Sequence, residues 1–135
     1  MAFRITEEVR FCYGHRLMDY VGRCARLHGH NARVQIVLGA PALDRRGFVM
    51  DFGDLESSVR AWIDARFDHR LLLRHDDPVI PVLRAAGEDF VALDENPTAE
   101  FLARAIFDHV KSQGLPVVEV RFWETETSVA SYDGG

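Results

Sequence analysis

The sequence predicts an α+β fold in which two helices cover one face of an antiparallel sheet. Two long stretches near the start of the chain alternate apolar and polar residues, as strands with one buried face do. Two later segments repeat apolar residues at helical spacing, and a last segment is rich in β-branched and aromatic residues. The predicted order of elements is therefore β-β-β-α-α-β.

The first three predicted strands follow one another closely. Residues 3–15 alternate, which places four side chains on one face: Val9, Phe11, Tyr13 and His15. A polar loop at 18–26 leads to a second strand from 28 to about 38. After a turn, residues 48–50 form a short third strand. Connections of this length predict an antiparallel meander.

The two helices have recognisable starts. Asp51 and Asp54 offer capping carboxylates to a first helix that runs to Phe67. The segment 71–93 contains two prolines, and we expect a long loop with at most one helical turn. Asn96 is the expected cap of the second helix, with Pro97 at its first position. Residues 117–124 form the final strand.

Length and composition indicate one globular domain spanning residues 1–135, with 47% apolar and 27% charged residues. These values exclude disordered, collagen-like and coiled-coil proteins. The net charge of −5 disfavours broad nucleic-acid binding, and no stretch approaches the roughly 18 apolar residues of a membrane helix. With two cysteines and no visible signal peptide, we expect a cytoplasmic protein with neither nucleic acid nor membrane as a partner.

Three histidines are candidate metal ligands. His28 and His30 lie two apart on a strand, so their imidazoles point to the same side of the sheet. His15 ends the preceding strand and becomes a third ligand if the two strands pair. Catalytic zinc sites commonly use three protein ligands and keep a fourth position for water or substrate. The pattern therefore predicts a zinc ion, Zn²⁺, held by three imidazoles.

Cys24 lies four residues before His28 and has two interpretations. It is either a fourth ligand of a closed, structural zinc site, or an uncoordinated thiol beside the metal that acts as a base or nucleophile. The spacing favours neither. The other cysteine, Cys12, is expected to be a core thiol.

Two further sites carry chemistry that the pattern alone does not establish. Asp68 precedes His69, and a carboxylate beside an imidazole can tune proton transfer, although a histidine at a helix end is the plainer explanation. Glu124 shares a face with apolar strand residues and would suit a ligand with two parallel N–H groups. Solvent exposure at the strand end is the plainer explanation for Glu124.

Six sequence blocks together resemble the 6-pyruvoyltetrahydropterin synthase superfamily, in family order and over nearly the whole chain. The resemblance is strongest to its 6-carboxytetrahydropterin synthase branch, which serves queuosine biosynthesis. Three residues separate Cys24 from His28, a spacing that is similar to this branch rather than to the animal pyruvoyl-forming branch. The blocks are residues 11–17, 24–31, 49–55, 67–72, 96–100 and 123–125.

The resemblance implies a tunnelling fold (T-fold), with a four-stranded antiparallel sheet and two helices on one side. It also implies that subunits join edge to edge into a closed barrel, commonly a hexamer. Such a homo-oligomer would protect the sheet edges, which otherwise invite uncontrolled pairing.

The resemblance also implies roles for individual residues. Three match the family's zinc ligands (His15, His28 and His30), Cys24 matches its catalytic cysteine, and Asp68 with His69 match its proton-relay pair. Glu124 matches the glutamate that anchors the pterin ring. The implied substrate is 7,8-dihydroneopterin triphosphate, and the implied products are 6-carboxytetrahydropterin, acetaldehyde and triphosphate. Arginines 16, 23 and 26 are candidate triphosphate ligands.

Two other functions remain open from the sequence. A 6-pyruvoyltetrahydropterin synthase would eliminate triphosphate and keep the side chain, and a non-catalytic module would use Cys24 and the histidines as a structural zinc site. The chain also departs from the resemblance at Tyr13, where the family usually has a small residue, and this bears on the substrate.

Overall fold

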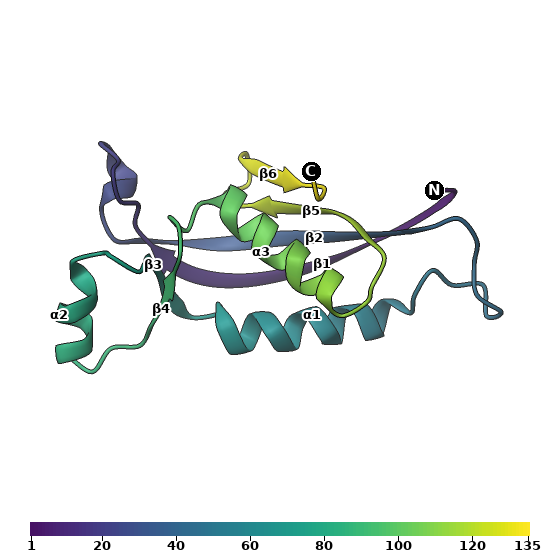
Figure 1. Cartoon of the computed structure of the whole chain (residues 1–135), viewed down its shortest axis with the longest axis horizontal. Coiled ribbons are helices and arrows are strands. Elements are labelled where there is room, and N and C mark those ends of the chain that lie inside the picture. Colours follow the sequence, from purple (N-terminus) through teal and green to yellow (C-terminus); the bar gives the residue numbers. More distant parts are fainter.

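The two long alternating stretches form the central hairpin of the sheet. In the computed structural model, which describes residues 1–135, β1 (Phe3–His15) pairs antiparallel with β2 (His28–Ala40). The register runs without interruption from Phe3 opposite Ala40 to His15 opposite His28. These two strands extend along most of the molecule (Figure 1), and both predicted strands are confirmed.

The complete sheet has six strands in the order β4-β3-β1-β2-β5-β6. Strands β1, β2, β5 and β6 pair antiparallel, whereas β3 pairs parallel with both β1 and β4. The remaining elements are η1 (Arg23–Ala25), α1 (Phe52–Arg66), β3 (Arg70–Arg74), α2 (Val79–Ala85), β4 (Phe90–Leu93), α3 (Ala99–Ser112), β5 (Val117–Trp123) and β6 (Val129–Tyr132).

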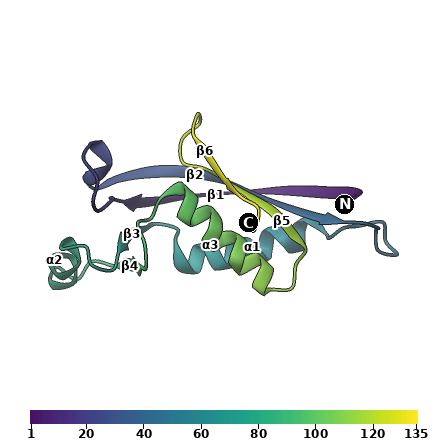
Figure 2. The same ribbon diagram turned by 45° about the horizontal axis from the view of Figure 1, so that its top comes forward.

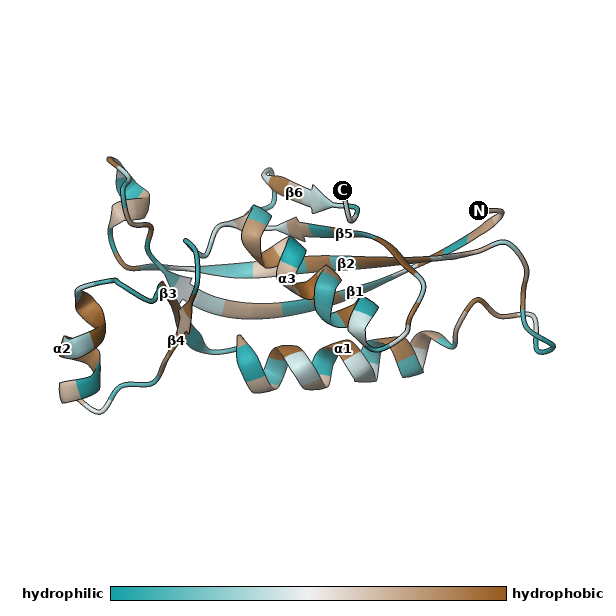
Figure 3. Ribbon diagram, in the orientation of Figure 1, coloured by the Kyte–Doolittle hydropathy of each residue, from teal (hydrophilic) through white to brown (hydrophobic).

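Helices α1 and α3 lie on the same side of the sheet (Figure 2). Each carries apolar and polar bands in alternation, as a helix with one buried stripe does (Figure 3). Leu55, Val59 and Ile63 of α1 and Leu102 and Ile106 of α3 join one core cluster with the inward side chains of β1, β2 and β5. The predicted pair of helices over one face is confirmed, and this face also holds His15, which is fully buried.

The expected four-stranded antiparallel sheet with two helices is wrong in detail, because the sheet is mixed and has two more strands. Segment 71–93 is not a long loop but contains β3, α2 and β4, a crossover between parallel strands. The apolar run that forms β3 lacks alternation because Leu72 and Leu73 are both buried. Strand β6 also went unpredicted, since it has only four residues.

Residues 48–50 do not form the predicted third strand. The side chain of Asp44 accepts hydrogen bonds from the backbone of Arg46 and Phe48, which holds this segment in a turn. Val49 and Met50 pack against the core without pairing, so their apolar character reflects burial rather than a strand.

The first helix begins as predicted, while the second begins later. The Asp51 side chain accepts a hydrogen bond from the Asp54 N–H and caps α1. Thr98, not Asn96, caps α3 by accepting from the Phe101 N–H, so Pro97 precedes the helix. The Asn96 side chain instead bonds both backbone groups of Met18, at 2.8 Å each. None of the helices has the length and apolar character needed to cross a membrane.

Candidate active site

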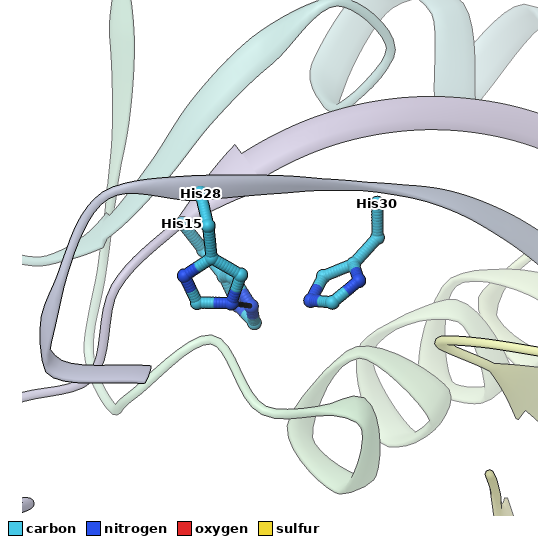
Figure 4. Close-up of side chains that lie close together, drawn as sticks. All are labelled: His15, His28 and His30. Atoms are coloured by element: carbon cyan, nitrogen blue, oxygen red, sulfur yellow. Dashed lines mark hydrogen bonds between the residues drawn. The ribbon is translucent and has the colours of Figure 1, made fainter. Parts of the chain in front are cut away.

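The strand register brings three imidazoles to one point. His15 lies directly opposite His28 on the neighbouring strand, and His30 lies two positions further along on the same face. One nitrogen from each ring lies within 4.8 Å of the other two. Figure 4 shows the three rings extending from the strands to the same side, with nitrogens turned toward a shared space. The predicted convergence is therefore present in the structure.

In two of the three rings, a hydrogen bond to a backbone carbonyl determines which nitrogen keeps its lone pair available. His15 Nδ1 donates to the carbonyl oxygen of Pro97 at 2.7 Å, and His28 Nδ1 donates to that of Arg26 at 2.6 Å. When the rings are neutral, both Nε2 atoms consequently carry lone pairs. These two atoms lie only 3.0 Å apart. Two facing lone pairs repel unless a cation lies between them, which is the arrangement that a metal site requires.

Burial keeps this site ready for a metal at neutral pH. It lowers the pKa of His15 to about 4, with smaller contributions from the positive charges that His28 and His30 would carry. Burial also lowers the pKa of His30, although the Glu124 carboxylate opposes this. Metals bind neutral imidazole, so these residues need not lose a proton before binding one.

Glu124 follows the end of β5 and reaches the histidines. Its Oε1 atom lies 3.3 Å from His15 Nε2 and 3.3 Å from His30 Nε2. The side chain is 25% exposed, and its backbone N–H bonds the carbonyl oxygen of Ser128. His30 Nε2 is buried and makes no hydrogen bond. Glu124 is thus placed beside the imidazoles rather than at a freely solvated strand end.

Cys24 lies in η1, on the loop that connects β1 to β2. Its carbonyl oxygen accepts from the Leu17 N–H at 2.8 Å, and its thiol is free and partly buried. The group of metal-binding donors contains the three histidines and no sulfur. Two hydrogen bonds between the Asn96 side chain and the Met18 backbone anchor the same loop to the segment before α3.

The structure does not bring Asp68 and His69 to the histidine cluster of their own chain. They follow α1 and lie beside Cys12, whose side chain points to the opposite face of the sheet from Phe11 and Tyr13. Cys12 is only partly buried and is not the core thiol that we expected. The Asp68 and His69 side chains line a groove of about 910 Å³ on that face.

Asp68 and His69 nevertheless form a well-connected pair. His69 Nδ1 lies 2.9 Å from Asp68 Oδ2, while Asp68 Oδ1 accepts from the Cys12 N–H at 3.1 Å. Burial alone would raise the pKa of Asp68, but the hydrogen bonds from His69 and Cys12 outweigh it and lower that pKa. His69 is 78% exposed and adopts φ 61°, a left-handed conformation that costs free energy in a non-glycine residue. Its ring is therefore presented outward, held by a partly buried carboxylate.

Several residues of the site gave no signal in the sequence. The carbonyl groups of Pro97 and Arg26 act through the backbone, which no side-chain pattern reveals. Tyr13 is buried next to the imidazoles, with its ring edge-on to that of His15, and its hydroxyl has no hydrogen-bond partner. Burial, followed by the charge of Glu124, raises the pKa of Tyr13. For Tyr13 the sequence did give two signals, its inward position in the alternating strand and its size where the resembling family usually has a small residue.

One of the three candidate phosphate-binding arginines is already engaged. Arg16 forms an ion pair with Asp77, which is buried, and the Nε to Oδ2 distance is 2.8 Å. Arg23 and Arg26 are exposed on the Cys24 loop and form no ion pair. The guanidinium groups of these two arginines are therefore not engaged by a carboxylate of this chain.

Comparison with known proteins identifies similar sequences along nearly the whole chain. A family model described as 6-pyruvoyl tetrahydropterin synthase matches residues 4–135. The chain is 32% identical to "6-carboxy-5,6,7,8-tetrahydropterin synthase" of Rickettsia typhi, covering 91% of this chain and 94% of the relative. It is 31% identical to the protein of the same name from Aquifex aeolicus, covering 98% of each.

Solved structures share the fold. The uncharacterized protein WS1659 of Wolinella succinogenes is 27% identical with a TM-score of 0.81, covering 98% of both chains. The 6-pyruvoyl tetrahydropterin synthase of Caenorhabditis elegans is 20% identical with a TM-score of 0.71, covering 98% of this chain and 96% of that one. The α+β architecture is thus the one seen in these proteins.

Proposed function

This chain belongs to the 6-pyruvoyl tetrahydropterin synthase family, and we propose that it acts as a 6-carboxy-5,6,7,8-tetrahydropterin synthase. The reaction converts 7,8-dihydroneopterin triphosphate and water to 6-carboxytetrahydropterin, acetaldehyde and triphosphate. The relatives described above carry this name over most of both chains. The observation that carries the proposal is the convergence of three histidine nitrogens and the Glu124 carboxylate on one buried face.

The metal of this site is zinc in our proposal, held by His15, His28 and His30. Three imidazoles suit zinc, and the lone pairs of His15 and His28 face each other at a distance that favours a shared cation. When bound, zinc would supply Lewis acidity toward the hydroxyl groups of the substrate side chain. The carbonyls of Pro97 and Arg26 would hold the two rings in the binding tautomer.

Cys24 and His69 move the protons in this proposal. The Cys24 thiol lies on a loop beside the histidine cluster and outside its donor group, which supports a role as base rather than ligand. Asp68 holds His69 Nδ1, so His69 Nε2 is free to accept or deliver a proton. Glu124 binds N–H groups of the pterin ring through its carboxylate. Arg23 and Arg26 remain candidates for binding the triphosphate.

A homo-oligomer follows from the separation of these residues. Because Asp68 and His69 lie on the far side of their own sheet, we propose that they complete the active site of a neighbouring subunit. Strands β4 and β6 have free edges for pairing between subunits, as in the hexameric barrel proposed for a tunnelling fold. The Cys24 loop exposes Tyr20, Val21 and Leu27, apolar side chains that suit burial against another subunit.

Product analysis tests the proposed reaction. The purified, zinc-loaded protein is incubated with 7,8-dihydroneopterin triphosphate, and pterins, acetaldehyde and triphosphate are quantified. We expect acetaldehyde and 6-carboxytetrahydropterin in equal amounts. Triphosphate without acetaldehyde would instead identify a 6-pyruvoyltetrahydropterin synthase, and absence of all products would favour a structural zinc module. We place the enzyme in the cytoplasm, which its two free thiols support.

A further inference from the structure

Glu124 contacts the histidine cluster in an unusual way. Its Oε1 atom is 3.3 Å from the Nε2 atoms of both His15 and His30. By contrast, the hydrogen-bonded pair of Asp68 and His69 is closer, at 2.9 Å, and involves Nδ1. One carboxylate oxygen thus lies equally far from two imidazole nitrogens that themselves lie beside a third.

Two of the three imidazoles offer Glu124 no proton when the rings are neutral. His15 donates its Nδ1 proton to Pro97, which leaves a lone pair on the Nε2 atom that faces Glu124. His28 is fixed in the same tautomer by Arg26. The buried Nε2 of His30 has no hydrogen-bond partner. The Glu124 carboxylate oxygen and the His15 lone pair would repel one another here, unless a cation is shared between them.

The two distances from Glu124 to the imidazoles match those expected around a shared metal ion. With zinc bonds of about 2.0–2.2 Å, the donors of a tetrahedral site lie about 3.3–3.5 Å from each other. The separations of Glu124 from His15 and His30 are both 3.3 Å and match this range. His15 and His28 are 3.0 Å apart, and Glu124 makes no such contact with His28, so the donors would have to shift slightly around a bound ion. Direct hydrogen bonds to carboxylates are typically shorter, about 2.7–2.9 Å.

The four donors differ in how firmly they are held. The histidines lie on two paired strands, and backbone carbonyls hold the rings of His15 and His28. Glu124 comes just after the last residue of β5, ahead of a turn, and is partly exposed. The carboxylate is therefore the donor that can leave while the imidazoles stay in place.

From these contacts we propose that Glu124 is a fourth, releasable ligand of the metal in the substrate-free protein. This rests on the proposed function for the identity of the metal and of the incoming pterin. Binding of the pterin draws the carboxylate onto the ring N–H groups, and the coordination position becomes available to the substrate. Glu124 thereby links recognition of the pterin ring to access to the metal.

Cobalt absorption tests this coordination directly. Co²⁺ replaces zinc in the full-length oligomer, and its visible bands report the number and type of ligands. We expect Glu124→Ala and Glu124→Gln to change the band positions and intensities relative to the wild type. Glu126→Gln, which alters an exposed carboxylate two residues away, is the matched control and should leave the spectrum unchanged. Identical spectra for wild type and Glu124→Ala would overturn the proposal.

Two further measurements extend the test. In competition with a chelator, zinc should bind Glu124→Ala roughly 10–100-fold more weakly than the wild type. Saturating biopterin, which lacks the triphosphate, should make the Co²⁺ spectra of wild type and Glu124→Ala converge. Spectra that stay as different as before would overturn the release of Glu124. Failure of wild-type turnover in the product assay would refute the proposed function and leave these spectra interpretable.

Discussion

His15 donates its Nδ1 proton to the carbonyl oxygen of Pro97, a residue 82 positions later in the chain. This 2.7 Å bond joins the end of β1 to the segment before α3 and directs the other ring nitrogen toward His28. The same segment holds Met18 through Asn96 and caps α3 through Thr98. Three residues in sequence therefore orient a candidate metal ligand, anchor the Cys24 loop and begin a helix.

We predict that His15→Ala abolishes stoichiometric metal binding. Two remaining imidazoles cannot hold zinc with the affinity of three, so metal content after dialysis should fall from about one per chain to near zero. The measurement is elemental analysis of the dialysed protein. His75→Ala changes an exposed histidine outside the cluster and should retain the metal. Full metal content in His15→Ala would remove this residue from the site.

Cys24→Ala should retain zinc and lose turnover. The thiol lies outside the three-histidine donor group, so the metal does not depend on it, whereas proton transfer does. We expect unchanged metal content and melting temperature, with kcat reduced about 100-fold or more. If the variant loses its metal and unfolds, Cys24 is a structural ligand and the non-catalytic alternative is correct.

Mixing two inactive variants should restore activity. Cys24→Ala keeps a functional His69 on the opposite face of its sheet, and His69→Ala keeps a functional Cys24. In mixed oligomers, some active sites combine the intact Cys24 of one subunit with the intact His69 of its neighbour. Turnover is measured after subunit exchange, which is verified with differently tagged chains. Persistent inactivity in proven mixed oligomers would place the complete site within one chain.

Glu124→Ala should weaken binding of a pterin. Removing a carboxylate that accepts hydrogen bonds from a bound ring costs about 2–4 kcal/mol, or roughly 30-fold or more in Kd. Calorimetric titration with biopterin measures this effect, and Glu126→Gln again provides the control. Equal affinities would exclude Glu124 as the pterin anchor.

The metal-free protein should become less stable as the pH falls from about 6.5 to about 4. Burial lowers the pKa of His15 to about 4 in the folded protein, so over this interval the unfolded chain binds more protons. Stability is therefore complete above pH 6.5 and decreases below it, by roughly 3 kcal/mol for this residue. Urea unfolding with EDTA at several pH values measures the slope. The His15→Gln variant should show a smaller dependence of stability on pH. An unchanged slope would contradict the assignment of this pH dependence to His15.

Much of the site could be predicted because it lies on regular structure. Alternation in β1 and β2 fixed which side chains share a face, and this placed His15, His28 and His30 together once the strands paired. The helices α1 and α3 were visible from their apolar periodicity and flanking residues. The strands and the helix of segment 71–93 could not be predicted in this way. Short buried strands lack alternation, and a seven-residue helix has too few turns to show a period.

The paired strands could be predicted without the structure, as could the two covering helices and the residue types able to bind a metal, because these features depend on local periodicity and residue chemistry. Three relationships appear only once the chain is folded: backbone carbonyls orient His15 and His28, Glu124 reaches ring nitrogens of the histidine cluster, and Asp68 and His69 lie on the other face. These relationships join residues far apart in sequence. They depend on strand register and on backbone groups, which every residue possesses and no side-chain pattern distinguishes.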